Sequence, residues 1–300
     1  MISQTDQPHP YNAMSTSPKS SHRPTKAYKN LDFLNSSAAR HIRILCELQE
    51  PAKRFREMGV ENTIIFFGSA RIPCSKVARQ RLEDAEKGVR EGKPDDEALA
   101  RRLRVARRHM RASVYHDKTI ELAREMALWS ATIPERERRF HICTGGGFGM
   151  MEAANRGAHE AGQTSVGLGI SLPFEPEPNP FATPELQFEF HYFMIRKYWF
   201  AYLAKAMVVT PGGFGTMDEL FEILTLRQTG KTSKPMPTVL LGSEFWNDIL
   251  RFEAFVEWGV ISEDDLHLFR IVDDVGEARD FLINELTKHY LEPYRTGLTV

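Results

Sequence analysis

The feature that most constrains the fold is a regular alternation of short apolar runs with longer segments of helical periodicity. The first run, Thr63-Ile-Ile-Phe-Phe67, is uninterrupted and ends directly in Gly68, as expected of a parallel strand covered on both faces. Strands that alternate with helices of this length indicate βαβ units and a parallel sheet. We therefore predict an α/β fold, a Rossmann-like doubly wound parallel sheet flanked by helices. Further strands are expected at 140–143, 164–170, 206–209, 238–241 and 269–272, and helices at 38–58, 150–161, 194–204, 216–228, 245–258 and 277–290.

Two segments lie outside this alternation. Residues 1 to about 30 are rich in Pro, Ser and Thr, which predicts a disordered tail before a single domain over 31–300. A charged, mostly helical insertion is expected at about 75–115. Its basic cluster, 101–111, is either an RNA or anion patch or a solvated helix face beside nearby acids. The second interpretation is favoured, because a lone basic helix on a neutral protein is weak evidence for a ligand.

Bulk composition excludes several classes of protein. A formal charge of −1 with a pI near 6.8 argues against a general nucleic-acid binder. Cys46, Cys74 and Cys143 are widely spaced without a CxxC pair, which fits a reducing cytoplasm and opposes a disulfide framework or a structural zinc site. No stretch approaches the ~20 apolar residues of a membrane span, and no secretory signal is recognisable. We expect a cytoplasmic protein that uses no metal.

Two glycine-rich turns follow strands in almost the same sequence. Thr144-Gly-Gly-Gly-Phe-Gly-Met-Met-Glu152 and Thr210-Pro-Gly-Gly-Phe-Gly-Thr-Met-Asp218 agree at six of nine positions, and each is expected to open a helix. We call residues 144–149 the first glycine turn and residues 210–215 the second. Backbone N–H groups at such a turn point along the positive end of the helix dipole, and glycine lets an anion approach them. Tight turns without a ligand are the alternative, but two matching turns suggest one phosphate-binding device used twice.

Neither turn matches a dinucleotide or triphosphate motif. G-x-G-x-x-G starting at Gly147 would need glycine where Glu152 stands, and the apparent Walker A end at 230–232 closes a helix instead of opening one. A monophosphate is therefore the expected ligand. Glu219 and Glu222 lie one helical turn apart beside the second turn, where the helix dipole and the cations of Arg196 and Lys197 favour an ionised carboxylate. Alternatively, both acids are caps and Arg196 is an ordinary surface residue.

The segment Pro211-Gly-Gly-Phe-Gly-Thr-Met-Asp-Glu219 resembles the P-G-G-x-G-T-x-x-E signature of the LOG ("lonely guy") family of cytokinin riboside 5'-monophosphate phosphoribohydrolases, formerly mislabelled lysine decarboxylases. The similarity runs from Gly68-Ser69 to Val272-Asp273, roughly the last 240 residues, and looks most like the larger bacterial branch, some of whose members split AMP. One departure is Ile195, which stands where many plant-type members carry an acid before the arginine. The base pocket is therefore expected to differ.

The resemblance implies hydrolysis of the N-glycosidic bond of a purine nucleoside 5'-monophosphate, either AMP or a cytokinin riboside monophosphate, without a cofactor. Arg196 and Glu219 match the family's catalytic arginine and glutamate, and the carboxylate would stabilise oxocarbenium character on the ribose while orienting or deprotonating water. The arginine would hold substrate and Glu219 in register through a bidentate contact. The expected substrate-binding residues are Ser69, Gly146, Gly147, Lys197, Gly212, Gly213, Gly215, Thr216 and Glu222.

The same residues allow two other functions to be weighed. A non-catalytic carrier of a nucleotide or of molybdenum cofactor would share the glycine turns but would need neither Arg196 nor Glu219. A PLP-dependent lysine decarboxylase is disfavoured, since Lys197 has no recognisable pyridinium partner nearby.

The family resemblance, together with the surplus aromatic residues of 194–204, predicts a homodimer or a larger homo-oligomer. The only other partner expected is the small nucleotide substrate.

Overall fold

The computed structural model describes residues 24–91, 96–172 and 178–292. The chain divides into two compact units after Leu45. The N-terminal unit contains a short 3-10 helix, Ala27–Lys29, the helix α1 (Leu31–Asn35) and the first turn and a half of α2 (Arg40–Met58). Asn30 caps α1 by accepting from the N–H of Phe33. Most of the expected disordered tail lies outside the described residues, so its boundary near residue 30 stays a prediction.

The larger unit is built on one seven-stranded sheet with all strands parallel, in the order β4-β3-β2-β1-β5-β6-β7. This confirms the predicted fold class. The central strands are buried along almost their whole length, because helices cover both faces and the sequence supplies uninterrupted apolar runs. The strands are β1 (Asn62–Phe67), β2 (Phe140–Thr144), β3 (Ser165–Ile170), β4 (Gln187–Phe190), β5 (Ala204–Val209), β6 (Thr238–Leu241) and β7 (Arg270–Val272).

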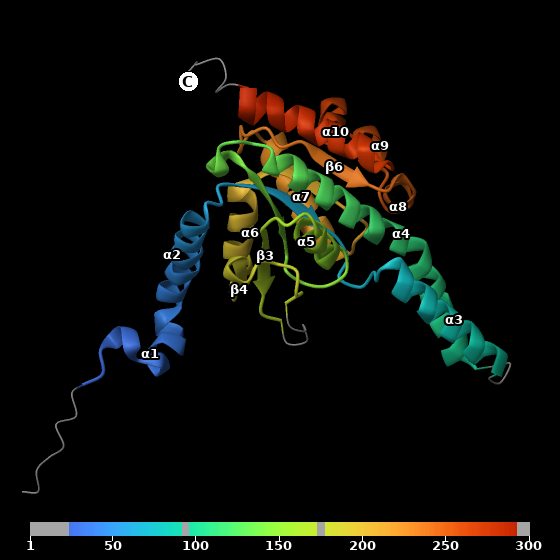
Figure 1. Cartoon of the computed structure of the whole chain (residues 1–300), viewed down its shortest axis with the longest axis horizontal. Coiled ribbons are helices and arrows are strands. Elements are labelled where there is room, and N and C mark those ends of the chain that lie inside the picture. The colour runs from blue at the N-terminus through green and yellow to red at the C-terminus, as the bar shows by residue number, and fades with distance from the viewer. Residues whose placement is uncertain (1–23, 92–95, 173–177, 293–300) are drawn as a thin grey trace, which may run out of the picture. The chain divides into compact units, whose positions relative to one another are not determined.

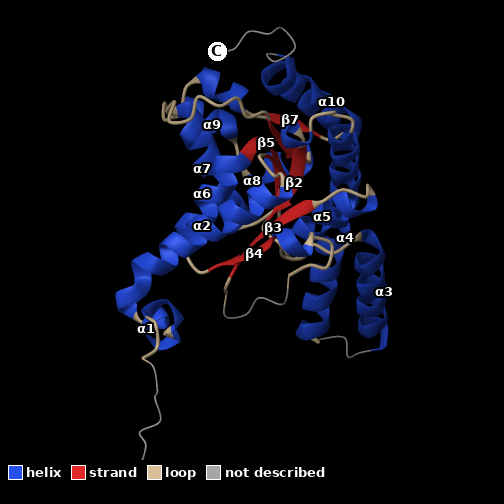
Figure 2. Cartoon of the chain, turned by 60° about the vertical axis from the view of Figure 1, so that its left-hand side comes forward, coloured by secondary structure: helices blue, strands red, loops and turns tan. Residues whose placement is uncertain are grey.

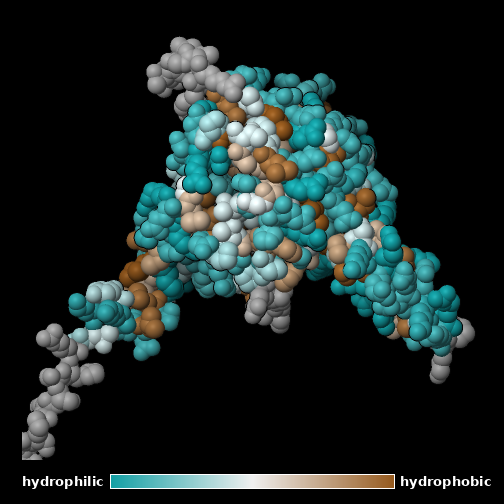
Figure 3. Space-filling model, in the orientation of Figure 1, coloured by the Kyte–Doolittle hydropathy of each residue, from teal (hydrophilic) through white to brown (hydrophobic). Residues whose placement is uncertain are grey.

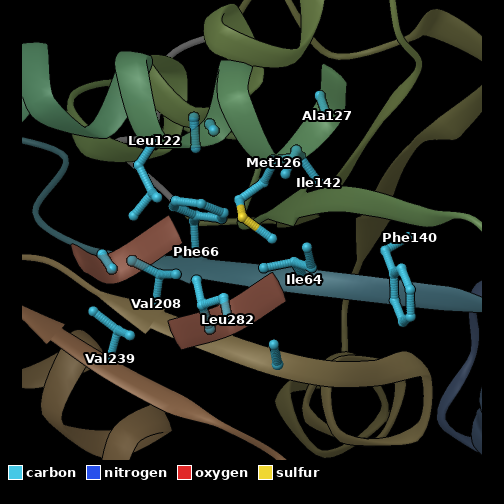
Figure 4. Close-up of a cluster of buried hydrophobic side chains, with 14 of the residues drawn as sticks. Ile64, Phe66, Leu122, Met126, Ala127, Phe140, Ile142, Val208, Val239 and Leu282 are labelled. Carbon is cyan, nitrogen blue, oxygen red and sulfur yellow. The ribbon is translucent and has the colours of Figure 1, made fainter. Parts of the chain in front are cut away.

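Helices pack on both sides of the sheet (Figure 2). On one side lie α4 (Glu97–Ala131), α5 (Met150–Glu160) and α10 (Val275–Leu286), and on the other lie α6 (Phe193–Leu203) and α7 (Phe214–Gln228). Leu122 and Met126 of α4 meet Phe66 of β1 and Leu282 of α10 in the main apolar cluster (Figure 4). Within the described ranges, every helix is too short or too polar to cross a lipid bilayer.

Two elements differ from the sequence prediction. An edge strand that was not predicted, β4, follows the Pro-rich segment 172–184. Its Phe188 and Phe190 are buried while Glu189 is exposed. A run of only four residues has too little periodicity to be recognised beforehand. The helix expected over 245–258 is two helices, α8 (Ser243–Ile249) and α9 (Phe252–Glu257), because Leu250 takes an extended conformation between them.

The charged insertion is a helical hairpin in which α3 (Ser75–Glu91) lies beside the first half of α4 (Figure 1). Its surface in view is mainly hydrophilic (Figure 3). Arg104 pairs with Glu97, and Arg111 pairs with Glu244, so part of the basic cluster is neutralised within the chain. This supports the solvated-face interpretation. At the base of the hairpin the hydroxyl groups of Ser75 and Ser113 lie 3.3 Å apart, where the chain leaves and rejoins the body of the unit.

The topology places a switch point between β1 and β5. The chain builds β1 to β4 in one direction along the sheet and then returns to place β5 on the other side of β1. Loops after these two strands meet, since the N–H of Ser69 donates to the Pro211 carbonyl at 3.0 Å and the N–H of Thr210 donates to that of Phe67 at 2.8 Å. In open parallel sheets ligands bind at this place, outside the carboxyl ends of the strands.

Candidate active site

The second glycine turn is the open one. It leads directly into α7, whose helical residues begin at Phe214, with Gly213 as the N-cap. Gly212 lies under the buried side chain of Thr216, and a Cβ on that glycine would collide with the threonine hydroxyl. By contrast, a Cβ on Gly213 or Gly215 would meet no described atom within 4 Å. The free N–H groups at the start of α7 therefore face accessible space, as an anion site at a helix N-terminus requires.

A buried polar network fixes the conformation of the first glycine turn. Gly146 and Gly149 have positive φ angles of 74° and 65°. The hydroxyl of Thr144 accepts from the N–H of Gly146 and donates to Asn155, while the amide of Asn179 donates to the carbonyl oxygens of Gly146 and Gly147 at 3.0 Å each. Sequence reasoning missed Asn179, because it lies in the Pro-rich loop with no motif around it.

The two turns differ in their backbone surroundings, although both open a helix as predicted. α5 begins at Met150, two positions later in the aligned motif than α7. The N–H of Met150 donates to the carbonyl of Ser69 at 3.0 Å, and the backbone of Gly149 approaches that loop too closely for any side chain. The first turn thus packs against the loop after β1, and part of its helix N-terminus is already satisfied by protein.

Glu219 lies in the second turn of α7 and is only 7% exposed. Desolvation by burial raises the pKa of its carboxyl to about 7, although the positive charges of Lys197 and Arg196 act to lower it. The expectation that the helix dipole and the cations would favour the ionised form is therefore wrong in its net direction. Burial outweighs them because the nearer cation, Lys197, is balanced by other acids.

Lys197 bridges α6 and α7. Its ammonium lies 2.7 Å from Glu222 and 2.9 Å from Asp218, both on α7. Desolvation lowers the pKa of Lys197, but these two hydrogen bonds and the surrounding carboxylates outweigh it and raise the pKa overall. Among the described residues, Glu219 has no ion pair. Lys197 and Glu222 therefore lie beside the candidate site as expected, but they contact one another.

Arg196 reaches the first glycine turn from α6. Its Nε donates to the carbonyl of Leu168 on β3 at 2.7 Å, and the guanidinium lies 5.1 Å from the ring centroid of Phe200. A Cβ on Gly145 would lie 2.5 Å from one of its terminal nitrogens, so this glycine makes room for the arginine. The guanidinium lies over the ends of β2 and β3. The bidentate contact expected to hold the substrate and Glu219 in register stays a prediction.

Several cavities open on the described part of the chain. One of about 290 Å³ includes the predicted substrate-binding residues Gly146 and Gly147, and one of about 480 Å³ lies beside Lys197, Glu222 and Phe214. Another, of about 820 Å³, lies between α3 and α4 and contains no predicted site residue. Ser69 lies at the switch point, where its hydroxyl accepts from the N–H of Arg71. No group of residues suited to hold a metal ion occurs among the described residues.

Comparisons with known proteins match one family model and several curated relatives. A family model described as "Possible lysine decarboxylase" matches residues 151–282. The chain is 28% identical over 192 residues to the cytokinin riboside 5'-monophosphate phosphoribohydrolase LOG of Oryza sativa subsp. japonica, covering 63% of this chain and 72% of that protein. It is 30% identical over 155 residues to "Probable cytokinin riboside 5'-monophosphate phosphoribohydrolase LOG4" of the same organism, covering 51% of this chain and 64% of that protein.

Solved structures give more distant matches. A structural-genomics X-ray structure is 19% identical with a TM-score of 0.43, covering 74% of this chain and 99% of that one. The Moco carrier protein from Chlamydomonas reinhardtii is 24% identical with a TM-score of 0.37, covering 57% of this chain and 88% of that one.

Proposed function

The chain belongs to the LOG family, and from that premise we propose that it hydrolyses the N-glycosidic bond of a purine nucleoside 5'-monophosphate. The products would be the free base and ribose 5-phosphate. AMP is the substrate we put first, because Ile195 replaces the acid that many plant-type members carry before the arginine. A cytokinin riboside monophosphate, the substrate class named for the curated relatives, is the second candidate.

The observation that carries this proposal is the buried carboxylate of Glu219. A carboxyl group with a pKa of about 7 is half ionised at neutral pH, which suits a group that accepts a proton from water. In its ionised form it also stabilises the positive charge that develops on the ribose as the bond to the base breaks. Arg196 would contact the substrate from α6, on the side of the first glycine turn.

The substrate phosphate would bind at the second glycine turn. Gly213 and Gly215 leave the N-terminus of α7 open, and the helix dipole favours a negative charge there. Binding energy from the phosphate would position the sugar against Glu219, so the turn contributes to rate as well as to affinity. The first turn would contribute Gly146 and Gly147 to the wall of the neighbouring cavity.

Glu219 also favours an enzyme over a non-catalytic nucleotide or molybdenum-cofactor carrier. A carrier gains nothing from an unpaired carboxylate buried beside an anion site, because that group opposes the binding of phosphate. The residues do not fit a PLP-dependent decarboxylase either. Such an enzyme needs a lysine amine that can be neutral, whereas Lys197 is held between two carboxylates that raise its pKa.

We further propose that the chain forms a homodimer or a larger homo-oligomer in the cytoplasm. Met194, Tyr198 and Tyr202 follow one another at intervals of four residues along an exposed face of α6, and the two tyrosine rings stack with centroids 5.2 Å apart. Phe214 is 96% exposed. Exposed aromatic residues grouped in this way are typical of interface cores. The cysteines Cys46, Cys74 and Cys143 are all free, as a reducing compartment requires.

The test is product analysis by chromatography after incubation with a panel of nucleoside monophosphates and the matching nucleosides. We expect AMP to yield adenine and ribose 5-phosphate, and adenosine to be nearly inert because it lacks the anchoring phosphate. Equal rates for AMP and adenosine would contradict the phosphate anchor. Binding of AMP without any product would favour the carrier.

A further inference from the structure

The helix that carries Arg196 and Lys197 does not stabilise its own ends. α6 has no acidic residue in its first turn and no basic residue in its last turn, and its N-cap Tyr192 makes no side-chain capping hydrogen bond. Helices are usually stabilised by an anion near the N-terminus and a cation near the C-terminus. In this chain both charges come from other elements.

The anion at the N-terminus is Glu47 of α2. Its carboxylate accepts from the N–H of His191 at 2.8 Å and from the N–H of Tyr192 at 3.3 Å, just before α6 begins. The backbone carbonyl of Glu47 also accepts from the indole N–H of Trp199 on α6 at 3.0 Å. One residue of α2 therefore contacts α6 at its start and again one and a half turns later.

The cation at the C-terminus is Lys234, which lies between α7 and β6. Its ammonium donates to the carbonyl of Ala201 at 2.7 Å and to that of Tyr202 at 3.0 Å, in the last turn of α6. These carbonyl groups have no partner within the helix, so a lysine is well suited to satisfy them. Burial, and then the nearby charge of Lys205, lowers the pKa of Lys234 to about 8. Assays of this contact therefore belong at pH 7 or below.

We propose that Glu47 and Lys234 are positioning residues that fix α6 at both ends, so that Arg196 is held over the first glycine turn and Lys197 against α7. This inference rests on the proposed function. Arg196 contacts Leu168 and Gly145 from its place on α6, and a slide or rotation of the helix would move its guanidinium away from both. Misplacement of a substrate-binding group by about 1 Å can cost ~10²-fold in rate.

The experiment compares truncating and conservative variants of the full chain at pH 7. Glu47→Ala and Lys234→Met remove the contacts, whereas Glu47→Gln keeps one acceptor and Lys234→Arg keeps the charge. We expect the truncations to lower the kcat for AMP, per folded molecule, by ~10-fold or more. The conservative variants should recover most of that loss. Glu57→Ala and Lys231→Met, at exposed positions of the same neighbourhoods, are matched controls that should leave kcat unchanged.

A second measurement separates this inference from the proposed function. Amide hydrogen exchange should become ~5-fold faster at His191 and Tyr192 in Glu47→Ala, because loss of one capping contact is worth about 1 kcal/mol, while β1 stays protected. Failure of the wild-type chain to cleave any monophosphate would remove the proposed function. Hydrogen exchange and AMP affinity would still test whether Glu47 and Lys234 hold α6 at its two ends. Unchanged exchange in Glu47→Ala would overturn the inference. So would faster exchange with a wild-type kcat, since the contact would then be structural only.

Discussion

The ammonium of Lys197 and the carboxylate of Glu222 form a 2.7 Å ion pair that joins α6 to α7. Asp218 shares the same ammonium, so two of the three acids at the start of α7 are balanced by one lysine. Glu219, which lies between them in sequence, is buried and has no ion pair among the described residues. Neighbouring acids on α7 therefore have different electrostatic surroundings.

Glu219→Gln should lower turnover by ~10²-fold or more, the scale lost when one preorganised electrostatic partner is removed from a transition state. The amide keeps the volume of the carboxyl group but removes its charge. Nucleotide binding should survive or tighten slightly, because the carboxylate no longer repels the phosphate. Calorimetry with AMP and product formation, measured on the same preparation, check both parts.

Glu222→Gln is the matched comparison for that variant. Because the Glu222 carboxylate is held by Lys197, its loss should weaken the link between α6 and α7 and reduce turnover less than the loss of Glu219. A larger effect at Glu222 than at Glu219 would transfer the catalytic role to Glu222.

The rate of AMP cleavage should rise with pH through about 7. The pKa of Glu219 is raised to about 7, chiefly by desolvation, so the ionised form that accepts a proton becomes the major species only above that pH. A kcat/KM profile between pH 5.5 and 8 measures this for the free enzyme. A profile that falls across this range would mean that Glu219 acts as an acid and donates the proton.

The same carboxyl group should make stability depend on pH. The pKa of Glu219 is higher in the folded state than its ordinary value, so the folded chain binds this proton more tightly than the unfolded chain does. The free energy of unfolding therefore falls as the pH rises from the ordinary pKa of a glutamate toward about 7. Glu219→Gln avoids that loss. At pH 8 it should be more stable than wild type by on the order of 1–3 kcal/mol, and at pH 5 by much less. Denaturant unfolding at both pH values gives the difference, and a constant difference would contradict burial as the cause.

Gly213→Ala should weaken phosphate binding without unfolding the chain. The backbone of Gly213 has φ −99° and ψ −153°, which alanine adopts, and its Cβ would meet no described atom. The added methyl group would instead occupy the space where the phosphate is proposed to approach. We expect a lower affinity for AMP with an unchanged Tm. Gly88→Ala, in the last turn of α3, is the control that should leave AMP affinity unchanged.

Assembly should depend on the exposed face of α6. Sedimentation of the wild-type chain at micromolar concentration should show a dimer or larger species. Tyr202→Glu, which places a charge beside the stacked Tyr198, should shift the population toward monomer. A strict monomer in the wild type would remove this proposal. Arg251→Glu, at an exposed position outside α6, tests whether any new acid has the same effect.

The parts of the fold that follow from local pattern were predictable. Uninterrupted apolar runs placed β1 and β5, and helical periodicity placed α5, α6 and α7 within a few residues. The short edge strand β4 and the break at Leu250 were not, because their conformation depends on neighbours distant in sequence. Strand β4, for instance, pairs in register with β3, and the centroid of its Phe188 ring lies 4.8 Å from that of Phe55 of α2, with the two rings tilted by 44°.

The sequence selects candidate residues for the site but not their ionisation or their partners. The motif singles out Arg196 and Glu219 as candidates, but spacing along a helix does not show that Lys197 is shared by Asp218 and Glu222. Burial of Glu219 depends on how α7 packs on the sheet, so the direction of its pKa shift requires the tertiary structure. The roles of Asn179, Glu47 and Lys234 depend on contacts between elements far apart in the chain, for which no local signal exists.

The contact between Ser75 and Ser113 makes the α3 and α4 hairpin a replaceable module. Its two attachment points are adjacent, so residues 76–112 can be exchanged for a short connection without stretching the backbone. The shortened α4 would then begin at Ser113, whose hydroxyl is suited to serve as a new N-cap. The remaining part of α4, with Leu122 and Met126, would still cover the sheet. Changes to the hairpin can therefore accumulate independently of the candidate site, since the glycine turns, Arg196 and Glu219 all lie outside the exchanged segment.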